Sequence, residues 1–87
     1  MTTNKELLAI REKATPRGVG IQTEIFADRA KNAEVWDVEG NRYIDLGTGI
    51  AVLATGHNHP RVVEAVKAQL ERFSHTCFQV TPYDVYV

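Results

Sequence analysis

The sequence predicts an α+β segment made of an N-terminal helix, a β-hairpin and an amphipathic helix, in that order along 87 residues. Residues 35–46 contain two runs of β-forming side chains joined by a short connection with a glycine, which favours an antiparallel hairpin. Residues 60–73 carry apolar side chains at helical spacing. A glycine-rich loop lies between these two stretches, so hairpin, loop and helix form the central part of the chain.

The first helix is expected over about residues 4–13. Thr3 and Glu6 have the spacing of a capping box, in which each side chain accepts a hydrogen bond from the backbone N–H of the other residue. Pro16 limits the helix, because a residue that precedes a proline is disfavoured from helical angles. The apolar patch at residues 25–30 is predicted as an irregular or extended piece.

The hairpin is expected from two strands, Val35–Val38 and Arg42–Leu46, whose side chains suit a pleated and half-buried surface. Three acidic side chains accompany these strands: Asp37, Glu39 and Asp45. Carboxylates in a hairpin usually lie on its solvated face. We therefore expect these three to contribute mainly to solubility.

The loop after the hairpin opens with Gly47-Thr48-Gly49, for which a tight turn is predicted. The second helix begins at Pro60, since a proline in the first turn loses no hydrogen bond there, and Asn58 or His59 is expected to cap it. One side of this helix is apolar and the other is charged or polar. The apolar side consists of Val62, Val63, Val66, Leu70 and Phe73.

Two further elements are expected near the C-terminus. Ser74–Val80 has β character and is predicted as a short strand. Thr81 and Pro82 have the order of a helix cap and first turn, with Asp84 near the positive end of the helix dipole. Because such a helix would be cut off within two turns at Val87, we expect the chain to be the N-terminal fragment of a longer protein.

Composition limits the function. A chain of 87 residues with 44% apolar and 24% charged residues is one small domain or a piece of a larger one. The net charge of −1, with dispersed basic residues, gives no electrostatic case for nucleic acid or anionic lipid. The longest apolar run, residues 50–54, is too short to cross a membrane. A single cysteine and a polar N-terminus without a signal sequence predict a cytoplasmic protein.

Three patterns suggest chemistry, but a structural explanation is favoured for each. His57, His59, His75 and Cys77 offer zinc-binding side chains, yet their spacing differs from that of known structural zinc sites, and no metal site is predicted. Gly47-Thr48-Gly49 lacks the rest of a dinucleotide or phosphate-binding motif. Cys77 has only His75 nearby as a base, and a buried, inert cysteine is the ordinary outcome.

Six motifs then occur in a fixed order and carry a family resemblance. They are PRGVG at residues 16–20, VWDVEG at 35–40, YID at 43–45, GIAVL at 49–53, TGHNHP at 55–60 and SHTCFQV at 74–80. Together they resemble the N-terminus of the class III aminotransferases, which depend on pyridoxal phosphate. The last motif narrows the resemblance to the bacterial 4-aminobutyrate aminotransferases and to the related branch acting on 5-aminovalerate.

The resemblance implies the N-terminal segment of a fold-type I pyridoxal-phosphate-dependent transferase, α/β overall, that forms a homodimer or homotetramer. Residues 1–57 would form the N-terminal part of the small domain, and residues 58–87 the start of the large cofactor-binding domain. Ile50 and Gln79 match substrate-binding positions. In this family the amino group of an ω-amino acid such as 4-aminobutyrate passes to 2-oxoglutarate, giving succinate semialdehyde and glutamate.

The resemblance also implies that the catalytic and cofactor-binding residues lie beyond position 87. The lysines present match no Schiff-base motif, so this chain alone is expected to be catalytically inactive. Two departures from the family pattern flank Ile50 and bear on pocket shape and donor choice. Leu46-Gly47-Thr48 stands where Phe-Ala-Gly is more usual, and Ala54 where Asn is common.

Two alternatives stay open at this stage. The length by itself favours a non-catalytic α+β interaction module or an inactive subunit. Within the aminotransferase interpretation, the sequence does not separate 4-aminobutyrate from 5-aminovalerate or another ω-amine as the donor.

Overall fold

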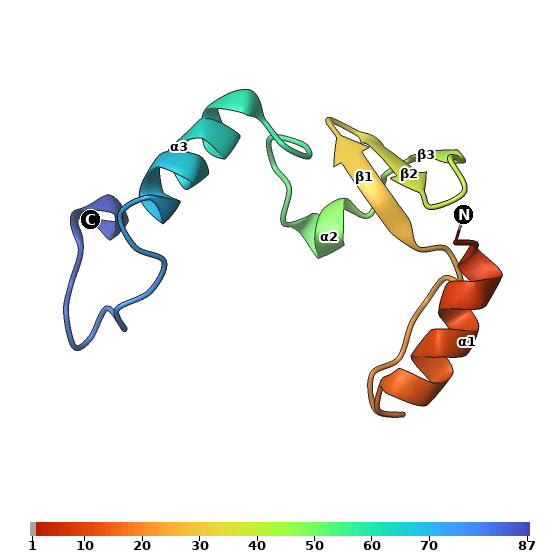
Figure 1. The fold of residues 1–87 in the computed structure, drawn as a ribbon. Helices are drawn as coiled ribbons and strands as arrows, with labels where there is room; N and C mark the ends of the chain where they lie inside the picture. Colours follow the sequence, from red (N-terminus) through yellow and green to blue (C-terminus); the bar gives the residue numbers. More distant parts are fainter. Residues whose placement is uncertain (1) are drawn as a thin grey trace.

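The computed structural model describes residues 2–87 as a three-stranded antiparallel sheet with helices before and after it (Figure 1). The strands are adjacent in chain order, β1-β2-β3. The elements are α1 (Asn4–Ala14), β1 (Ala27–Lys31), β2 (Glu34–Asp37), β3 (Arg42–Ile44), α2 (Thr48–Ala51), α3 (Pro60–Leu70) and a 3₁₀ turn, η1 (Asp84–Tyr86).

Helix α1 confirms the predicted capping box. The backbone N–H of Glu6 donates to the Thr3 hydroxyl over 3.2 Å, and the N–H of Thr3 donates to the Glu6 carboxylate over 2.9 Å. The helix ends at Ala14, and Thr15 before Pro16 is extended, as the proline requires. Local signals therefore fixed both ends of this helix.

The predicted hairpin is present as β2 and β3, and a further strand joins it. Strand β1 contains Ala30 of the patch predicted as irregular or extended, whereas Ile25 and Phe26 lie before the strand; β1 pairs with β2. The Arg29 guanidinium lies 3.9 Å from the ring centroid of its cross-strand partner Trp36. On the other edge, Arg42 forms an ion pair with Glu34 over 2.9 Å. Side chains on neighbouring strands thus support both registers.

The prediction that Asp37 merely adds solubility is wrong. Asp37 is 2% exposed and is the one buried residue with a side-chain charge among residues 2–87. Its carboxylate accepts hydrogen bonds from the side chains of Asn4, Asn41 and Tyr43 at 3.0–3.1 Å. It also accepts from the backbone N–H groups of Glu39 and Asn41. One carboxylate therefore closes the β2–β3 turn and fastens the start of α1 to it.

The surroundings of Asp37 also set its titration. Burial acts to raise its pKa, but the hydrogen bonds from Asn41, Asn4 and Tyr43 outweigh burial and lower the pKa from 3.8 to about 2. Because the pKa is lower in the folded state, the stabilisation is present above about pH 3.8 and is lost as the pH falls toward 2.

Helix α3 begins at Pro60 as predicted, but two predictions for the residues after it are wrong. Ser74–Val80 forms no strand; it contains a turn in which the N–H of Val80 donates to the Cys77 carbonyl over 2.8 Å. Residues 2–87 supply no neighbouring strand to pair with it, and β propensity without pairing does not form a strand. The expected helix start at Thr81 is a 3₁₀ turn beginning at Asp84, with Tyr83 before it.

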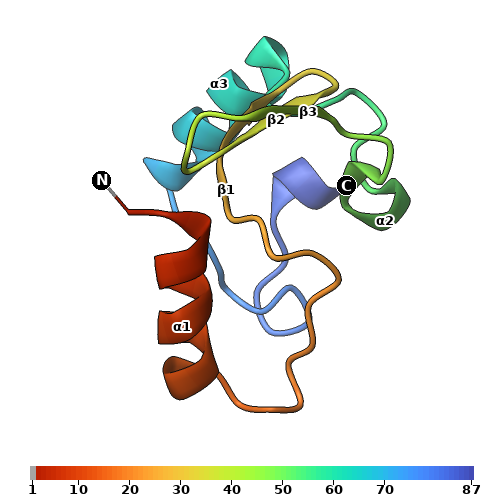
Figure 2. The same cartoon turned by 90° about the vertical axis from the view of Figure 1, so that its right-hand side faces the viewer.

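No apolar side chain of residues 2–87 is buried. The radius of gyration is 16.9 Å, against about 12 Å for a compact domain of this length. Figure 1 shows α1 at one end of the molecule and the C-terminal turn at the other, and Figure 2 shows α1 projecting from the sheet. The elements are thus connected mainly by the sheet and by polar contacts.

None of the helices in this part of the chain has the length and apolar character needed to span a membrane.

The first prediction concerns Asp37. In the full-length protein, Asp37→Asn should lower the thermal midpoint by several degrees, because an amide N–H would then face the donors of Asn4, Asn41 and Tyr43. Asp28→Asn, at an exposed position of β1, is the matched control and should leave the midpoint unchanged. Equal midpoints for the two variants would contradict the role given to Asp37.

The second prediction concerns the missing core. The 87-residue chain alone should show no sharp thermal transition by circular dichroism and should bind a hydrophobic dye, because its apolar side chains are exposed. A cooperative transition together with absent dye binding would contradict this expectation.

Candidate functional site

The motif at residues 56–60 connects the sheet to α3, and its first two residues hold the connection against the β1–β2 turn. Gly56 has φ +77°, and a Cβ added to it would lie 3.0 Å from the Asn32 backbone. Only glycine fits such a close approach at this φ. His57 then pairs with Asn32 through two backbone hydrogen bonds of 2.8 and 3.0 Å.

The rest of the motif starts α3. The Asn58 side-chain amide donates to the Ala30 carbonyl over 3.1 Å. His59 Nδ1 accepts from the backbone N–H of Arg61 over 3.2 Å, which confirms His59 as the cap, and Pro60 opens the helix. Each residue of the motif therefore has a structural role: it either holds the connection to the sheet or starts α3.

Asp45 and His57 form a contact that sequence reasoning missed. His57 Nε2 lies 2.6 Å from Asp45 Oδ2, and the two side chains are 22% and 18% exposed. Asp45 was expected on a solvated face, so that prediction is wrong. The hydrogen bond from His57, followed by the one from the Thr48 N–H, lowers the pKa of Asp45 below its usual value. The two residues are twelve positions apart and belong to no periodic pattern, so the sequence held no signal for the pair.

The other carboxylate oxygen of Asp45 organises the loop that follows. Asp45 Oδ1 accepts from the backbone N–H groups of Gly47 and Thr48 at 3.0 and 2.9 Å. The predicted tight turn is present, but it is longer and left-handed. Thr48, Gly49, Ile50 and Ala51 have φ values of 48°, 63°, 60° and 61°. Left-handed geometry is disfavoured for residues with a Cβ, most of all for β-branched ones, so the surroundings must hold it.

Ile50, the first predicted substrate-binding residue, stands on this left-handed turn in α2. It is 94% exposed, so within residues 2–87 nothing covers its side chain. Strained and exposed backbone of this kind is characteristic of functional sites. Ile50 thus combines a strained left-handed backbone with an exposed side chain.

Gln79, the second predicted residue, lies in the turn after α3 and is exposed. The Cys77 carbonyl accepts from the N–H groups of Val80 and Thr81, and the Thr76 hydroxyl donates to the Thr81 carbonyl over 2.8 Å. Figure 1 shows this C-terminal loop well separated from α2. The described residues therefore do not bring Ile50 and Gln79 into one pocket.

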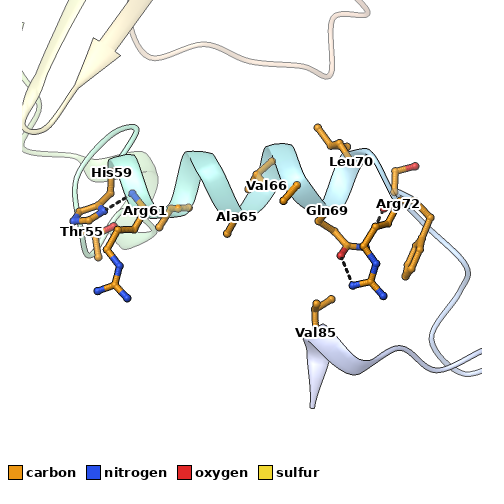
Figure 3. A pocket seen from close by; sticks show the side chains of 13 residues that line it. Thr55, His59, Arg61, Ala65, Val66, Gln69, Leu70, Arg72 and Val85 are labelled. Atoms are coloured by element: carbon orange, nitrogen blue, oxygen red, sulfur yellow. Dashed lines mark hydrogen bonds between the residues drawn. The ribbon is translucent and has the colours of Figure 1, made fainter.

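A groove of about 880 Å³ runs along α3, but it does not include either predicted residue. Figure 3 shows Ala65, Val66 and Leu70 along this helix, with Val85 facing it from η1. Gln69 and Arg72 in the groove hydrogen-bond to each other. The groove follows the open apolar side of α3. Its labelled polar side chains lie at the two ends, with Thr55, His59 and Arg61 at one and Gln69 and Arg72 at the other, so they do not converge on one point as the polar groups of a substrate site do (Figure 3).

The described residues also give no metal centre or cofactor anchor. No group of three His, Cys, Asp or Glu side chains comes together within residues 2–87. All four lysines are exposed: Lys5, Lys13, Lys31 and Lys67. None of them stands in a closed cavity such as a Schiff-base lysine requires.

Comparison with known proteins identifies the family. The model of the family "Aminotransferase class-III" matches residues 15–87. The chain belongs to the class III aminotransferases. It is 61% identical over its whole length to 4-aminobutyrate aminotransferase GabT of Escherichia coli K12, and it covers 20% of that protein. It is 56% identical over 98% of its length to 5-aminovalerate aminotransferase DavT of Pseudomonas aeruginosa, again covering 20%.

Solved structures of the family contain the same fold. The ornithine aminotransferase of Toxoplasma gondii, crystallized with oxidized glutathione and with partial occupancy of pyridoxal phosphate at its active site, matches with a TM-score of 0.76. The match has 32% sequence identity and covers 87% of this chain and 17% of that one. The chain also spans only about a fifth of the length of the curated relatives it matches. The α+β segment is thus part of a pyridoxal-phosphate-dependent transferase fold.

A third prediction tests the close approach of Gly56 to Asn32. Gly56→Ala in the full-length protein should lower the free energy of unfolding by about 1–3 kcal/mol, because a Cβ would strain the backbone and meet Asn32. The matched control is Gly18→Ala, since nothing lies within 4 Å of an added Cβ there. Urea unfolding of both variants measures the difference, and equal midpoints would exclude the close approach.

Proposed function

We propose that the whole protein transfers the terminal amino group of 4-aminobutyrate, or a similar ω-amino acid, to 2-oxoglutarate, giving succinate semialdehyde and glutamate. The observation that supports this most strongly is the 61% identity, over the whole of this chain and 20% of the relative, to a 4-aminobutyrate aminotransferase. The 56% identity to a 5-aminovalerate aminotransferase makes that longer donor the main competitor. Class III membership defines the reaction class, and donor choice depends on the pocket.

Pyridoxal phosphate is the cofactor of this proposal, and it would supply the electron sink for transamination. The described residues do not fit it: their lysines are exposed, and the buried Asp37 already accepts five hydrogen bonds from its own surroundings. No catalytic step is therefore assigned to this chain. The proposal places cofactor binding and the reactive lysine in residues beyond position 87.

In the proposed function, the contribution of this segment is to shape the substrate pocket. In the proposal, residues 1–57 belong to the small domain and residues 58–87 begin the large one. Ile50 forms an apolar wall for the donor, and Gln79 makes a polar contact near its amino group. The full exposure of Ile50 on a strained turn supports this assignment. The separation of Ile50 from Gln79 means that other parts of a homodimer or homotetramer would complete the pocket between them.

The alternative of a free-standing interaction module has less support. A module that folds alone needs a buried apolar core, and residues 2–87 contain none. An inactive subunit remains distinguishable by assay of the full-length protein. We place the active protein in the cytoplasm, in line with its composition and lone cysteine.

A fourth prediction tests the two pocket residues in the full-length enzyme loaded with pyridoxal phosphate. Ile50→Gln should lower kcat/KM for 4-aminobutyrate about 10–100-fold, because a polar group would replace the apolar wall. Gln79→Ala should lower it about tenfold through the loss of one polar contact. Steady-state kinetics with both ω-amino donors gives these values.

Matched controls are available on the exposed loop before β1. Ile21→Gln and Gln22→Ala make the same chemical changes at exposed positions away from α2 and should leave kcat/KM unchanged. Wild-type kinetics for Ile50→Gln and Gln79→Ala would remove both residues from the pocket. Absence of ω-amino transfer by the wild-type protein would reject the proposed function itself.

A further inference from the structure

The loop that carries Ile50 is anchored at both ends to the same turn of the sheet. At its start, the Asp45 N–H donates to the Ala33 carbonyl over 2.8 Å. At its end, the His57 N–H donates to the carbonyl of the neighbouring Asn32, also over 2.8 Å. The side chains of Asp45 and His57 then meet at 2.6 Å and join the two ends to each other. Residues 46–56 therefore form a closed loop whose base is a carboxylate–imidazole pair.

The same carboxylate controls the interior of the loop. Asp45 Oδ2 contacts His57, while Asp45 Oδ1 accepts the N–H groups of Gly47 and Thr48. These two N–H groups begin the left-handed turn, which continues with the Ile50 N–H donating to the Gly47 carbonyl over 2.9 Å. A change in the position of the carboxylate therefore changes the start of the turn and, through it, the position of Ile50.

We propose that Asp45 and His57 are positioning residues that fix the left-handed turn and thereby set where Ile50 stands against the amino donor. This proposal rests on the proposed function, because Ile50 must first be part of the pocket. His57 touches neither substrate nor cofactor in this scheme; it holds the Asp45 carboxylate by a charge-assisted hydrogen bond. Its effect is on donor choice, since a small displacement of a pocket wall changes which chain length fits.

Three other residues of the loop could fix its conformation, but they do not replace the Asp45–His57 pair. Leu46 is 90% exposed and Val52 is 72% exposed, so the packing of these two side chains does not hold the turn. Gly56 fixes the exit of the loop only, through its contact with Asn32. The Asp45–His57 pair is the side-chain interaction in this part of the chain that links the entry, the exit and the turn.

The experiment uses the full-length holoenzyme with three variants. His57→Leu replaces the donor with an apolar side chain of similar size, and His57→Gln keeps an N–H donor. His75→Leu makes the matched change at an exposed histidine outside the loop. Hydrogen–deuterium exchange of peptides covering residues 46–57 is measured first, because it needs no turnover. The protected amides there are those of Gly47, Thr48, Ile50, Ala51, Val52, Leu53, Gly56 and His57.

Exchange of these amides should be about tenfold faster or more in His57→Leu, close to wild type in His57→Gln, and unchanged in His75→Leu. The kcat/KM ratio for 4-aminobutyrate against 5-aminovalerate should change about tenfold in His57→Leu and recover in His57→Gln. In an Ile50→Ala background, His57→Leu should leave this ratio unchanged, because the wall through which it acts is absent.

The outcomes separate this proposal from the proposed function. Unchanged exchange in His57→Leu would overturn the proposal whatever the enzyme's activity. Faster exchange with an unchanged donor ratio, or a ratio that changes equally in the Ile50→Ala background, would overturn positioning and leave a structural role only. A wild-type enzyme without ω-amino transfer would reject the proposed function and the effect on donor choice together, whereas the exchange result would still decide whether the pair fixes the loop.

Discussion

Two aspartate carboxylates hold this chain in shape. Residues 2–87 bury no apolar side chain, so the buried core that positions elements in most domains is not present among them; their apolar contacts are between partly exposed side chains, such as Phe73 and Tyr83. Asp37 takes the place of such a core at the base of the hairpin, where it connects α1 to the β2–β3 turn. Asp45 does the same one strand later, where it connects the sheet to the loop before α3. Each carboxylate accepts hydrogen bonds from residues that the chain brings from several positions, which is why neither can be replaced by an amide without loss.

The sequence predicts correctly those features of the structure that depend on residues close together in the chain. The capping box at Thr3 and Glu6, the hairpin strands and the Pro60 start of α3 depend on neighbours within a few residues, and all three predictions are confirmed. The strand predicted at Ser74–Val80 depends on a partner strand, which residues 2–87 do not supply, and it is a turn instead. Propensity therefore succeeded where the interaction is local and failed where it requires a distant partner.

For the candidate site, too, some features were predicted from the sequence and others were not. Asp37 and Asp45 were assigned to solvent because carboxylates in a hairpin usually lie on its solvated face. Several of their donors are close in the chain, but Asn4 and His57 come from 33 and 12 residues away, and no spacing in the sequence marks these two. Ile50 and Gln79 were predicted by family resemblance, since no physical pattern marks an exposed isoleucine or glutamine as functional. The structure adds a physical reason for Ile50 only, in the left-handed turn that carries it. For Gln79 it shows an exposed side chain on a hydrogen-bonded turn.

The strain in that turn bears on how the site is completed. Three residues with a Cβ in left-handed conformation, Thr48, Ile50 and Ala51, cost on the order of 3–6 kcal/mol together. Covering one isoleucine side chain contributes about 1.5–3 kcal/mol. Within residues 2–87 the Ile50 side chain contributes nothing of this kind, because it is 94% exposed. The turn is therefore stabilised from its base by Asp45, and a surface that covers Ile50 would stabilise it further. In the proposed function the apolar chain of the amino donor supplies that covering surface, and the backbone strain of the turn is already present before the donor arrives.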